Sequence, residues 1–257
     1  MEYSSTEMIA CLAARLMAGQ STAFIGTGIP LLGAALAKKL YAPDLIPVFE
    51  FGGIGSTLEE LPLGVGEART FRRALAAAGI CDVMETAQRG LISIGLLGGA
   101  QIDVYGNLNT TVIGSHDRPK VRLPGSGGGN DVGSLCWRTV ILMKQDKKRF
   151  VKKLDFLTTP GYLRGGRSRE KAGLAVGTGP YRVVTDLGLF DFEPASRRMR
   201  LIALNPGVGL SEAKAASEFS FLTAKTIIKN EPPTEVELKL LREELDREKI
   251  FRKTLAV

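Results

Sequence analysis

Two short apolar runs separated by a glycine-rich turn and a helical pattern constrain the fold more than any other feature of this sequence. Residues Ser21 to Ile25 form the first run, and Leu45 to Phe49 form the second. Short apolar runs bounded by turn residues are typical of buried strands. Between them, Gly26 to Pro30 predicts a turn and then a helix to about Leu40, because proline suits the first helical turn. Strand, turn, helix and strand make a βαβ unit, which predicts a parallel sheet here.

Signals elsewhere extend this prediction to the rest of the chain. Ser4 and Glu7 match a capping box that opens an amphipathic helix, and Gly19 ends it. The later predicted elements are helices over Asp82–Arg89 and Glu235–Asp246, and strands over Leu91–Leu97, Thr139–Met143, Tyr181–Thr185 and Met199–Leu204. We therefore expect an α/β fold: an open, mostly parallel sheet flanked by helices, with an antiparallel meander toward the C-terminus.

The length of 257 residues suffices to bury one large core or two small ones. We expect a single domain over residues 1–257, with residues 230–257 as a C-terminal helical extension. Glu231, Pro232 and Pro233 form the predicted linker to this extension.

Charge and rare residue types exclude several classes of protein. The net charge of +7 suits an anionic ligand, but the 27 acidic residues are interspersed with the basic ones and few aromatics accompany the basic clusters. We therefore expect no nucleic-acid partner. The chain has one histidine, His116, which excludes a multi-histidine metal site and argues against a Ser/His/Asp triad, so no metal is expected.

Cysteine usage and hydropathy predict where the protein works. Cys11, Cys81 and Cys136 are odd in number and have no metal-binding spacing, which indicates a reducing, cytoplasmic compartment. No basic region precedes an apolar core at the N-terminus, and no apolar run reaches membrane-spanning length. We therefore expect no signal peptide and no membrane partner.

The turn Gly26-Thr27-Gly28 suggests a dinucleotide-binding fold only at first sight. The full fingerprint needs a third glycine at the start of the helix, and Gly33 comes too late. NAD binding is therefore not predicted.

A single carboxylate, Glu50, follows the second apolar run, and Phe51, Gly52 and Gly53 come directly after it. In open α/β sheets, ligands bind beyond the carboxyl ends of the strands. We therefore expect Glu50 at the mouth of a crevice, where the glycines leave room for a substrate carbonyl. The alternative is an exposed turn that begins at Glu50, which is the commoner situation for a lone glutamate after a strand.

Two further glycine loops are candidates for the same crevice. Gly98, Gly99 and Ala100 follow the strand that ends at Leu97, although a plain connection with Asp103, Gly106 and Asn107 as turn formers is the alternative. The second loop, Gly125 to Gly129, exposes consecutive backbone N–H groups, so it suits an anion-binding nest or an oxyanion hole. A flexible surface loop is an equal alternative for this segment.

Basic residues gather after the second loop, over residues 144–153 and 164–169. Solvated charge is the default interpretation, and phosphate binding or subunit contact is the alternative.

The ordered set of motifs resembles the family I CoA-transferases, and among them the β subunit of glutaconate CoA-transferase. The resemblance covers nearly the whole chain. It is carried by Gly26–Ala34, Tyr41–Asp44, Gly98–Asp103, Tyr105–Asn107, Arg118–Lys120, Gly125–Gly128 and Thr185–Gly188. Each motif is weak alone, and their common order makes the set specific.

The resemblance implies a CoA-transferase in which Glu50 is the nucleophile. Glu50 would attack an acyl-CoA carbonyl to give an anhydride, and the CoA thiolate would then form a glutamyl-CoA thioester from which a second carboxylate, implied to be a dicarboxylate, collects CoA. A carboxylate that is ionised at neutral pH needs no base, which agrees with the single histidine.

The same resemblance implies the surroundings of this nucleophile. The N–H groups of Gly127 and Gly128 are the candidates to receive the oxyanion charge. The candidates for contact with substrate or CoA are Gly98, Gly99, Ala100, Gln101, Phe51 and Gly52. Coenzyme A is implied as a substrate and no permanently bound cofactor is expected. A homologous α subunit is implied as partner, in an α2β2 or larger hetero-oligomer.

One residue departs from the family pattern. The family usually follows its glutamate with a small polar residue and then glycine, whereas here Phe51 precedes Gly52. The departure leaves an acyl-CoA hydrolase or a lyase (decarboxylase) on the same scaffold as an alternative. A third alternative is a non-catalytic scaffold subunit, in which Glu50 would be buried against an arginine and away from any pocket.

Overall fold

The computed structural model describes residues 2–253, and its first helix begins at the predicted capping box. Helix α1 spans Ser5–Leu16. The Ser4 hydroxyl oxygen accepts from the Glu7 N–H at 3.2 Å, and the Glu7 carboxylate accepts from the Ser4 N–H at 2.8 Å. Two N–H groups that the helix leaves unpaired are thereby satisfied.

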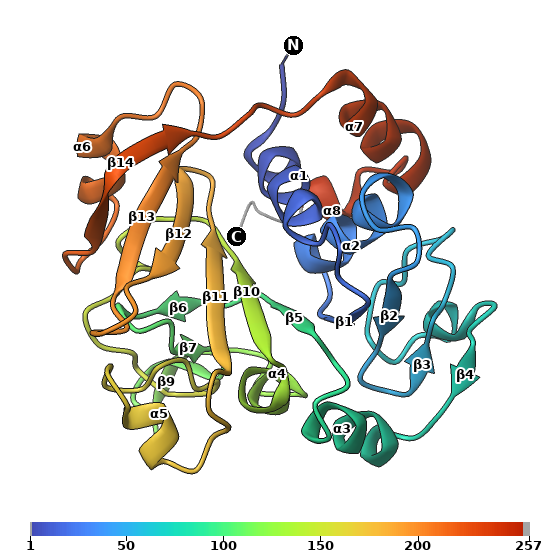
Figure 1. Ribbon diagram of the computed structural model, residues 1–257, viewed down its shortest axis with the longest axis horizontal. Coiled ribbons are helices and arrows are strands. Elements are labelled where there is room, and N and C mark those ends of the chain that lie inside the picture. The colour runs from blue at the N-terminus through green and yellow to red at the C-terminus, as the bar shows by residue number, and fades with distance from the viewer. Residues whose placement is uncertain (1, 254–257) are drawn as a thin grey trace. The chain divides into compact units, whose positions relative to one another are not determined.

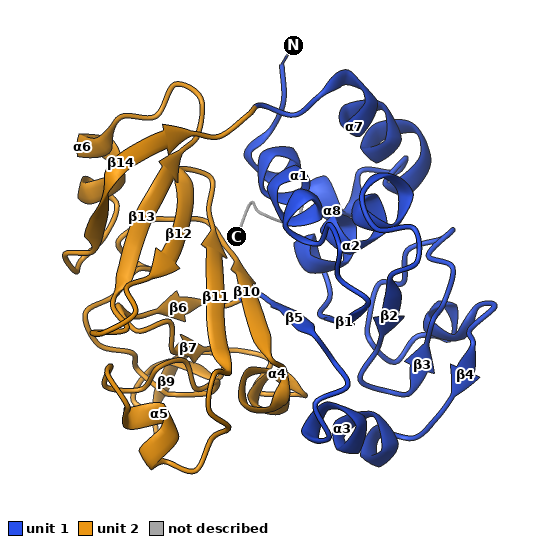
Figure 2. Ribbon diagram, viewed as in Figure 1, with its two compact units in different colours: residues 1–98, 232–257 blue, residues 99–231 orange. Residues whose placement is uncertain are grey.

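The described chain divides into two units, coloured separately in Figure 2. Unit 1 contains residues 2–98 and 232–253, and unit 2 contains Gly99–Glu231. The single domain expected over residues 1–257 stays a prediction.

Unit 1 is built on the predicted βαβ unit (Figure 1). Its elements after α1 are β1 (Thr22–Ile25), α2 (Ile29–Leu40), β2 (Ile46–Val48), β3 (Gly53–Ile54), the 3₁₀ helix η1 (Ala68–Phe71), β4 (Ala76–Ala77), α3 (Ile80–Gln88) and β5 (Ile94–Leu97). Strand β1 pairs in parallel with β2 and with β5, which confirms the parallel arrangement. The short strands β3 and β4 then add antiparallel pairs on the far side of β2.

Helices α1 and α2 pack against each other through small residues. A Cβ atom on Gly33 would lie 2.9 Å from the Cβ of Ala13, so only glycine allows this close approach. Met8, Ile9, Leu32 and Leu36 are buried around the contact. The apolar stripe predicted for the first helix therefore faces the core of unit 1.

The C-terminal helices belong to unit 1, where α7 (Glu235–Lys239) continues into a π-helical turn, η2 (Leu240–Leu245), before α8 (Ile250–Lys253). Thr234 caps α7, because its hydroxyl oxygen accepts from the Glu237 N–H at 3.2 Å. Glu237 also forms an ion pair with Arg15 of α1 at 2.6 Å, which the sequence did not predict. The predicted extension over residues 230–257 runs past the described residues at 254–257.

Unit 2 holds the predicted meander. Its elements are β6 (Gln101–Ile102), β7 (Leu108–Asn109), β8 (Val112–Gly114), β9 (Pro119–Arg122), α4 (Gly129–Leu135), β10 (Arg138–Leu142), α5 (Ser168–Lys171), β11 (Gly179–Val184), β12 (Gly188–Phe192), β13 (Met199–Leu204), α6 (Leu210–Ala215) and β14 (Leu222–Lys229). Strand β10 is parallel to β11, β11 to β13 form the antiparallel meander, and β14 is parallel to β13. The rings of Phe150, Phe190, Phe219 and Phe221 pack together within this unit.

The predicted fold class is confirmed: α/β, with parallel central strands, flanking helices and an antiparallel meander toward the C-terminus. Across residues 2–253, every helix is too short or too polar to traverse a bilayer.

Candidate active site

Glu50 lies at the tip of the hairpin that joins β2 to β3. The Gly52 N–H donates to the Phe49 carbonyl oxygen at 3.0 Å, so Glu50 and Phe51 are the two central residues of a β-turn. Glu50 is half-buried, and its carboxylate forms no hydrogen bond or ion pair within the described residues. The arginine contact expected of a non-catalytic scaffold is therefore not formed in this part of the chain. A carboxylate at the end of a strand with no internal partner is open to a ligand.

The two glycines after Glu50 are explained by the protein's own packing. Gly52 has a φ of +109°, and a Cβ there would lie 1.8 Å from the carbonyl oxygen of Ala78. A Cβ on Gly53 would lie 2.1 Å from the carbonyl oxygen of Thr70. The space that these missing side chains leave is thus filled by backbone, which corrects the expectation that it accommodates a substrate carbonyl. Contact between Gly52 and the substrate stays a prediction.

Phe51 is the neighbour of Glu50 that departs from the family pattern. Its side chain is 46 % exposed, and its ring lies 3.4 Å from where a Cβ of Gly66 would stand. The ring therefore covers Gly66 on one side, and much of its remaining apolar surface is exposed next to Glu50 in the chain.

The Gly98-Gly99-Ala100 loop leads from β5 to β6. Gly98 is exposed, a Cβ on Gly99 would lie 3.0 Å from Cδ2 of Leu108, and the Ala100 N–H donates to the Asn109 carbonyl oxygen at 3.0 Å. These contacts hold the loop against β7, and its substrate contacts stay a prediction.

Gln101 forms structural hydrogen bonds that the sequence analysis did not predict. It is 6 % exposed, and its Nε2 donates to Asp155 Oδ2 at 2.9 Å. Its Oε1 accepts from Asn109 Nδ2 at 2.7 Å and from the Asp155 N–H at 3.1 Å. The side chain thus joins β6, β7 and the segment around Asp155. Its predicted role toward the substrate is untested.

The alternative interpretation of Asp103, Gly106 and Asn107 as turn formers is confirmed. Asp103 Oδ1 accepts from the Tyr105 N–H at 2.9 Å, and its Oδ2 accepts from Asn107 Nδ2 at 2.8 Å. Burial raises the pKa of the Asp103 carboxyl, although these donors oppose the shift. The turn joins β6 to β7.

The second glycine loop offers free donors. Gly127 is exposed with a φ of +46°, and Gly128 is the N-cap of α4. The neighbouring N–H groups of Gly125 and Gly129 donate to the carbonyl oxygens of Thr110 and Ser126, both at 2.8 Å. In contrast, the N–H groups of Gly127 and Gly128 donate to no group within residues 2–253. The two predicted oxyanion donors are thus unengaged within the described part of the chain.

Arg169 anchors the helix that follows this loop, and the sequence did not single it out. It is 2 % exposed, so the default interpretation of this basic cluster as solvated charge is wrong for Arg169. Its guanidinium donates to oxygens of Gly133, Ser134, Pro160, Gly161 and Thr178 at 2.7–3.2 Å. No carboxylate is among these partners, and burial lowers the pKa of Arg169 to about 10. Every residue has a backbone carbonyl group, so the residue types in the sequence do not predict which carbonyls Arg169 contacts.

No three side chains among the His, Cys, Asp and Glu of residues 2–253 gather in a way that could hold a metal ion. The histidine, His116, stacks on Phe156 with ring centroids 5.3 Å apart.

Comparison with known proteins shows the family to which the chain belongs. The family model described as coenzyme A transferase matches residues 6–212. The chain is 36 % identical to the β subunit of 3-oxoadipate CoA-transferase of Pseudomonas knackmussii, over 93 % of this chain and 92 % of that one. It is 35 % identical to the β subunit of glutaconate CoA-transferase of Acidaminococcus fermentans, over 97 % and 95 % of the two chains.

The fold agrees equally well. The crystal structure of glutaconate CoA-transferase from Acidaminococcus fermentans superposes with a TM-score of 0.92, over 100 % of this chain and 98 % of that one. From the family model, the two relatives and this superposition, we conclude that the chain belongs to the coenzyme A transferase family and is similar to its β subunits.

Proposed function

We propose that this chain is the β subunit of a two-subunit enzyme that moves CoA from an acyl-CoA to a carboxylic acid, with Glu50 as the nucleophile. The observation that carries the proposal is the half-buried Glu50 carboxylate, which stands at the end of β2 without an internal partner. Membership of the CoA-transferase family supplies the reaction class.

The chemistry proceeds by covalent catalysis. A Glu50 oxygen attacks the thioester carbonyl, the C–S bond breaks, and CoA leaves as the thiolate while a mixed anhydride forms. The thiolate then attacks the glutamyl carbonyl, which gives the glutamyl-CoA thioester and releases the first carboxylate. The acceptor carboxylate repeats these two steps in reverse, so the Glu50 carboxylate is regenerated and no proton, metal or redox partner is consumed.

Each addition step places negative charge on a carbonyl oxygen, which needs hydrogen-bond donors. The unengaged N–H groups of Gly127 and Gly128 are our candidates for this role. Losing one such donor typically raises the barrier by about 3–4 kcal/mol.

The names of the relatives support a substrate class and a partner. Glutaconate and 3-oxoadipate are both dicarboxylates, so we expect a dicarboxylate as the acceptor or as the acyl group. Both relatives are named as one of two kinds of subunit, so we expect a separate α subunit to complete the enzyme, in an α2β2 or larger assembly.

Borohydride trapping tests the nucleophile. After incubation of the assembled enzyme with acyl-CoA, reduction should convert Glu50 to the corresponding alcohol, which peptide mass spectrometry detects. Glu50→Gln should abolish both transfer and trapping, whereas Glu85→Gln, at an exposed glutamate of α3, should leave both unchanged. Full transfer activity in Glu50→Gln would refute the assignment.

A hydrolase is the second candidate, because the exposed ring of Phe51 stands where the family usually has a small polar residue. If water is the natural acceptor, acyl-CoA will be hydrolysed at the same rate with and without an acceptor acid. A transferase should instead respond to the acceptor, and Phe51→Ser should change the acceptor's KM more than the rate of adduct formation.

A further inference from the structure

Unit 2 contains a pocket that the reaction described above does not use. Its volume is about 960 Å³. Four cationic side chains line it: Lys152, Lys153, Arg164 and Lys171. All four residues are exposed, and none of these side chains forms an ion pair or a hydrogen bond within the described residues. Four cations around one hollow that form no ion pair are suited to an anionic ligand.

The acidic residues of the same pocket are already engaged. Asp103 accepts from Asn107 and from two backbone N–H groups, as part of the β6–β7 turn. Asp155 Oδ2 accepts from Gln101 Nε2 at 2.9 Å and from the Gly114 N–H at 3.1 Å. Both carboxylates are therefore held by internal donors, whereas the ammonium and guanidinium groups stay available to a ligand.

The pocket also has an apolar wall. Phe156 and Leu157 line it, and Leu157 is 46 % exposed. Phe156 is stacked on His116, so its ring is held in place by an aromatic neighbour. A fixed aromatic ring beside unpaired cations matches a ligand that combines a flat base with phosphate groups.

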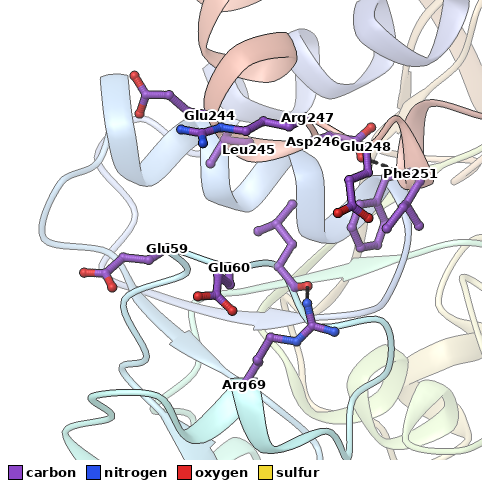
Figure 3. A pocket seen from close by; sticks show the side chains of 11 residues that line it. Glu59, Glu60, Arg69, Glu244, Leu245, Asp246, Arg247, Glu248 and Phe251 are labelled. Atoms are coloured by element: carbon purple, nitrogen blue, oxygen red, sulfur yellow. Dashed lines mark hydrogen bonds between the residues drawn. The ribbon is translucent and has the colours of Figure 1, made fainter.

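A second pocket, in unit 1, has the opposite character. Its volume is about 380 Å³, and Figure 3 shows Glu59, Glu60, Glu244 and Glu248 around it. Five carboxylates and two arginines, Arg69 and Arg247, line this pocket, so its lining is net acidic. A polyanion would be repelled there, which leaves the cationic pocket as the better site for phosphate.

We propose that the cationic pocket binds the phosphorylated adenosine end of CoA, with the 3′-phosphate against the lysines and the adenine against Phe156. This inference rests on the proposed function, since that function makes CoA the substrate. It adds a binding site for the non-reacting end of CoA, built entirely from residues of unit 2.

The test compares CoA with dephospho-CoA, which lacks the 3′-phosphate. Calorimetric titration of the full-length chain should give a smaller Kd for CoA than for dephospho-CoA. Lys153→Gln and Lys171→Gln should each weaken CoA binding by about 5-fold, which is the upper range for one exposed ion pair. The double variant should bind both ligands equally. Lys225→Gln, at an exposed lysine of β14 outside the pocket, should retain the wild-type preference.

The outcomes separate this inference from the function on which it rests. Unchanged Kd values in the double variant, together with a normal borohydride-trapped adduct on Glu50, would overturn the pocket assignment alone. Equal binding of CoA and dephospho-CoA by the wild type would do the same. A wild-type chain that binds neither ligand, and an assembled enzyme that forms no Glu50 adduct, would overturn both. Glu50→Gln should keep the wild-type preference for CoA, because the pocket does not include Glu50.

Discussion

Arg169 Nη2 donates to the carbonyl oxygen of Gly133 at 2.7 Å, and this bond ties a buried cation to the helix that follows the second glycine loop. A Cβ on Gly133 would lie 2.3 Å from Cγ2 of Thr159, so the helix rests directly on the segment that Arg169 also contacts at Pro160 and Gly161. Gly127 and Gly128 thus immediately precede a helix whose other end is held by Arg169.

Replacing Arg169 by lysine should destabilise the chain even though the charge is kept. An ammonium has three donors instead of five and cannot reach carbonyls on two segments, so buried oxygens lose their partners. We expect a loss of about 2–4 kcal/mol in the free energy of unfolding, measured by urea titration. Arg167→Lys is the matched control, because that side chain is 81 % exposed and should change stability by less than about 0.5 kcal/mol. Equal effects of the two substitutions would contradict the anchoring role.

Gly128→Pro should remove the proposed oxyanion donor without changing the conformation of the loop. Gly128 has a φ of −75°, which a proline ring adopts, and its N–H has no acceptor within the described residues. The variant should therefore fold, yet lose about 10²–10³ in kcat, because one donor to the developing oxyanion is gone. Steady-state kinetics measures the loss in kcat, and a thermal melt of the same sample shows whether the variant folds. An unaltered kcat would remove Gly128 from the proposed mechanism.

Gly52→Ala should be severely destabilising, although glycine-to-alanine changes are often mild. The new methyl group would lie 1.8 Å from the Ala78 carbonyl oxygen, so the Glu50 hairpin must move. We expect a loss of about 3 kcal/mol or more, together with loss of the Glu50 adduct. Gly64→Ala is the control, because no atom lies within 4 Å of the position that its Cβ would take. Chemical denaturation of both variants decides the comparison.

Glu7 should make the stability of unit 1 sensitive to acid. Burial raises the pKa of this carboxyl, but hydrogen bonds from Arg242 and Ser4 outweigh burial and lower the pKa to about 2 from its usual 4.5. Because the pKa in the folded state is the lower one, the contribution is complete above about pH 4.5 and disappears as the pH falls toward 2. Its upper bound is about 3.5 kcal/mol, at ~1.4 kcal/mol for each pKa unit between about 2 and 4.5.

The difference in unfolding free energy between the wild type and Glu7→Gln isolates this contribution from the other acids. The difference should be constant between pH 5 and 7, and should shrink from about pH 4.5 downward. A difference that is independent of pH down to 2.5 would show that the Arg242 contact does not hold the carboxylate in its charged form.

Local signals in the sequence determined the elements that depend on neighbours along the chain. Ser4 with Glu7 and Thr234 with Glu237 mark their helices because a capping box is completed within four residues. Short apolar runs bounded by turn residues were enough to predict the βαβ unit and the meander, and strand β13 was predicted to its exact ends. The position of Glu50 after a strand likewise followed from the chain order alone.

Only the tertiary structure decided which of those residues are engaged and which are open. The sequence does not show that Glu50 has no partner in the described residues, whereas Glu237 is held by Arg15 across 222 positions. The same is true of the buried Arg169 and the exposed Arg167, which are two residues apart. Burial and pairing depend on segments that meet only in three dimensions. The type of a residue determines which chemical group it carries. The fold determines whether that group is engaged by other residues of the protein or is available to a substrate.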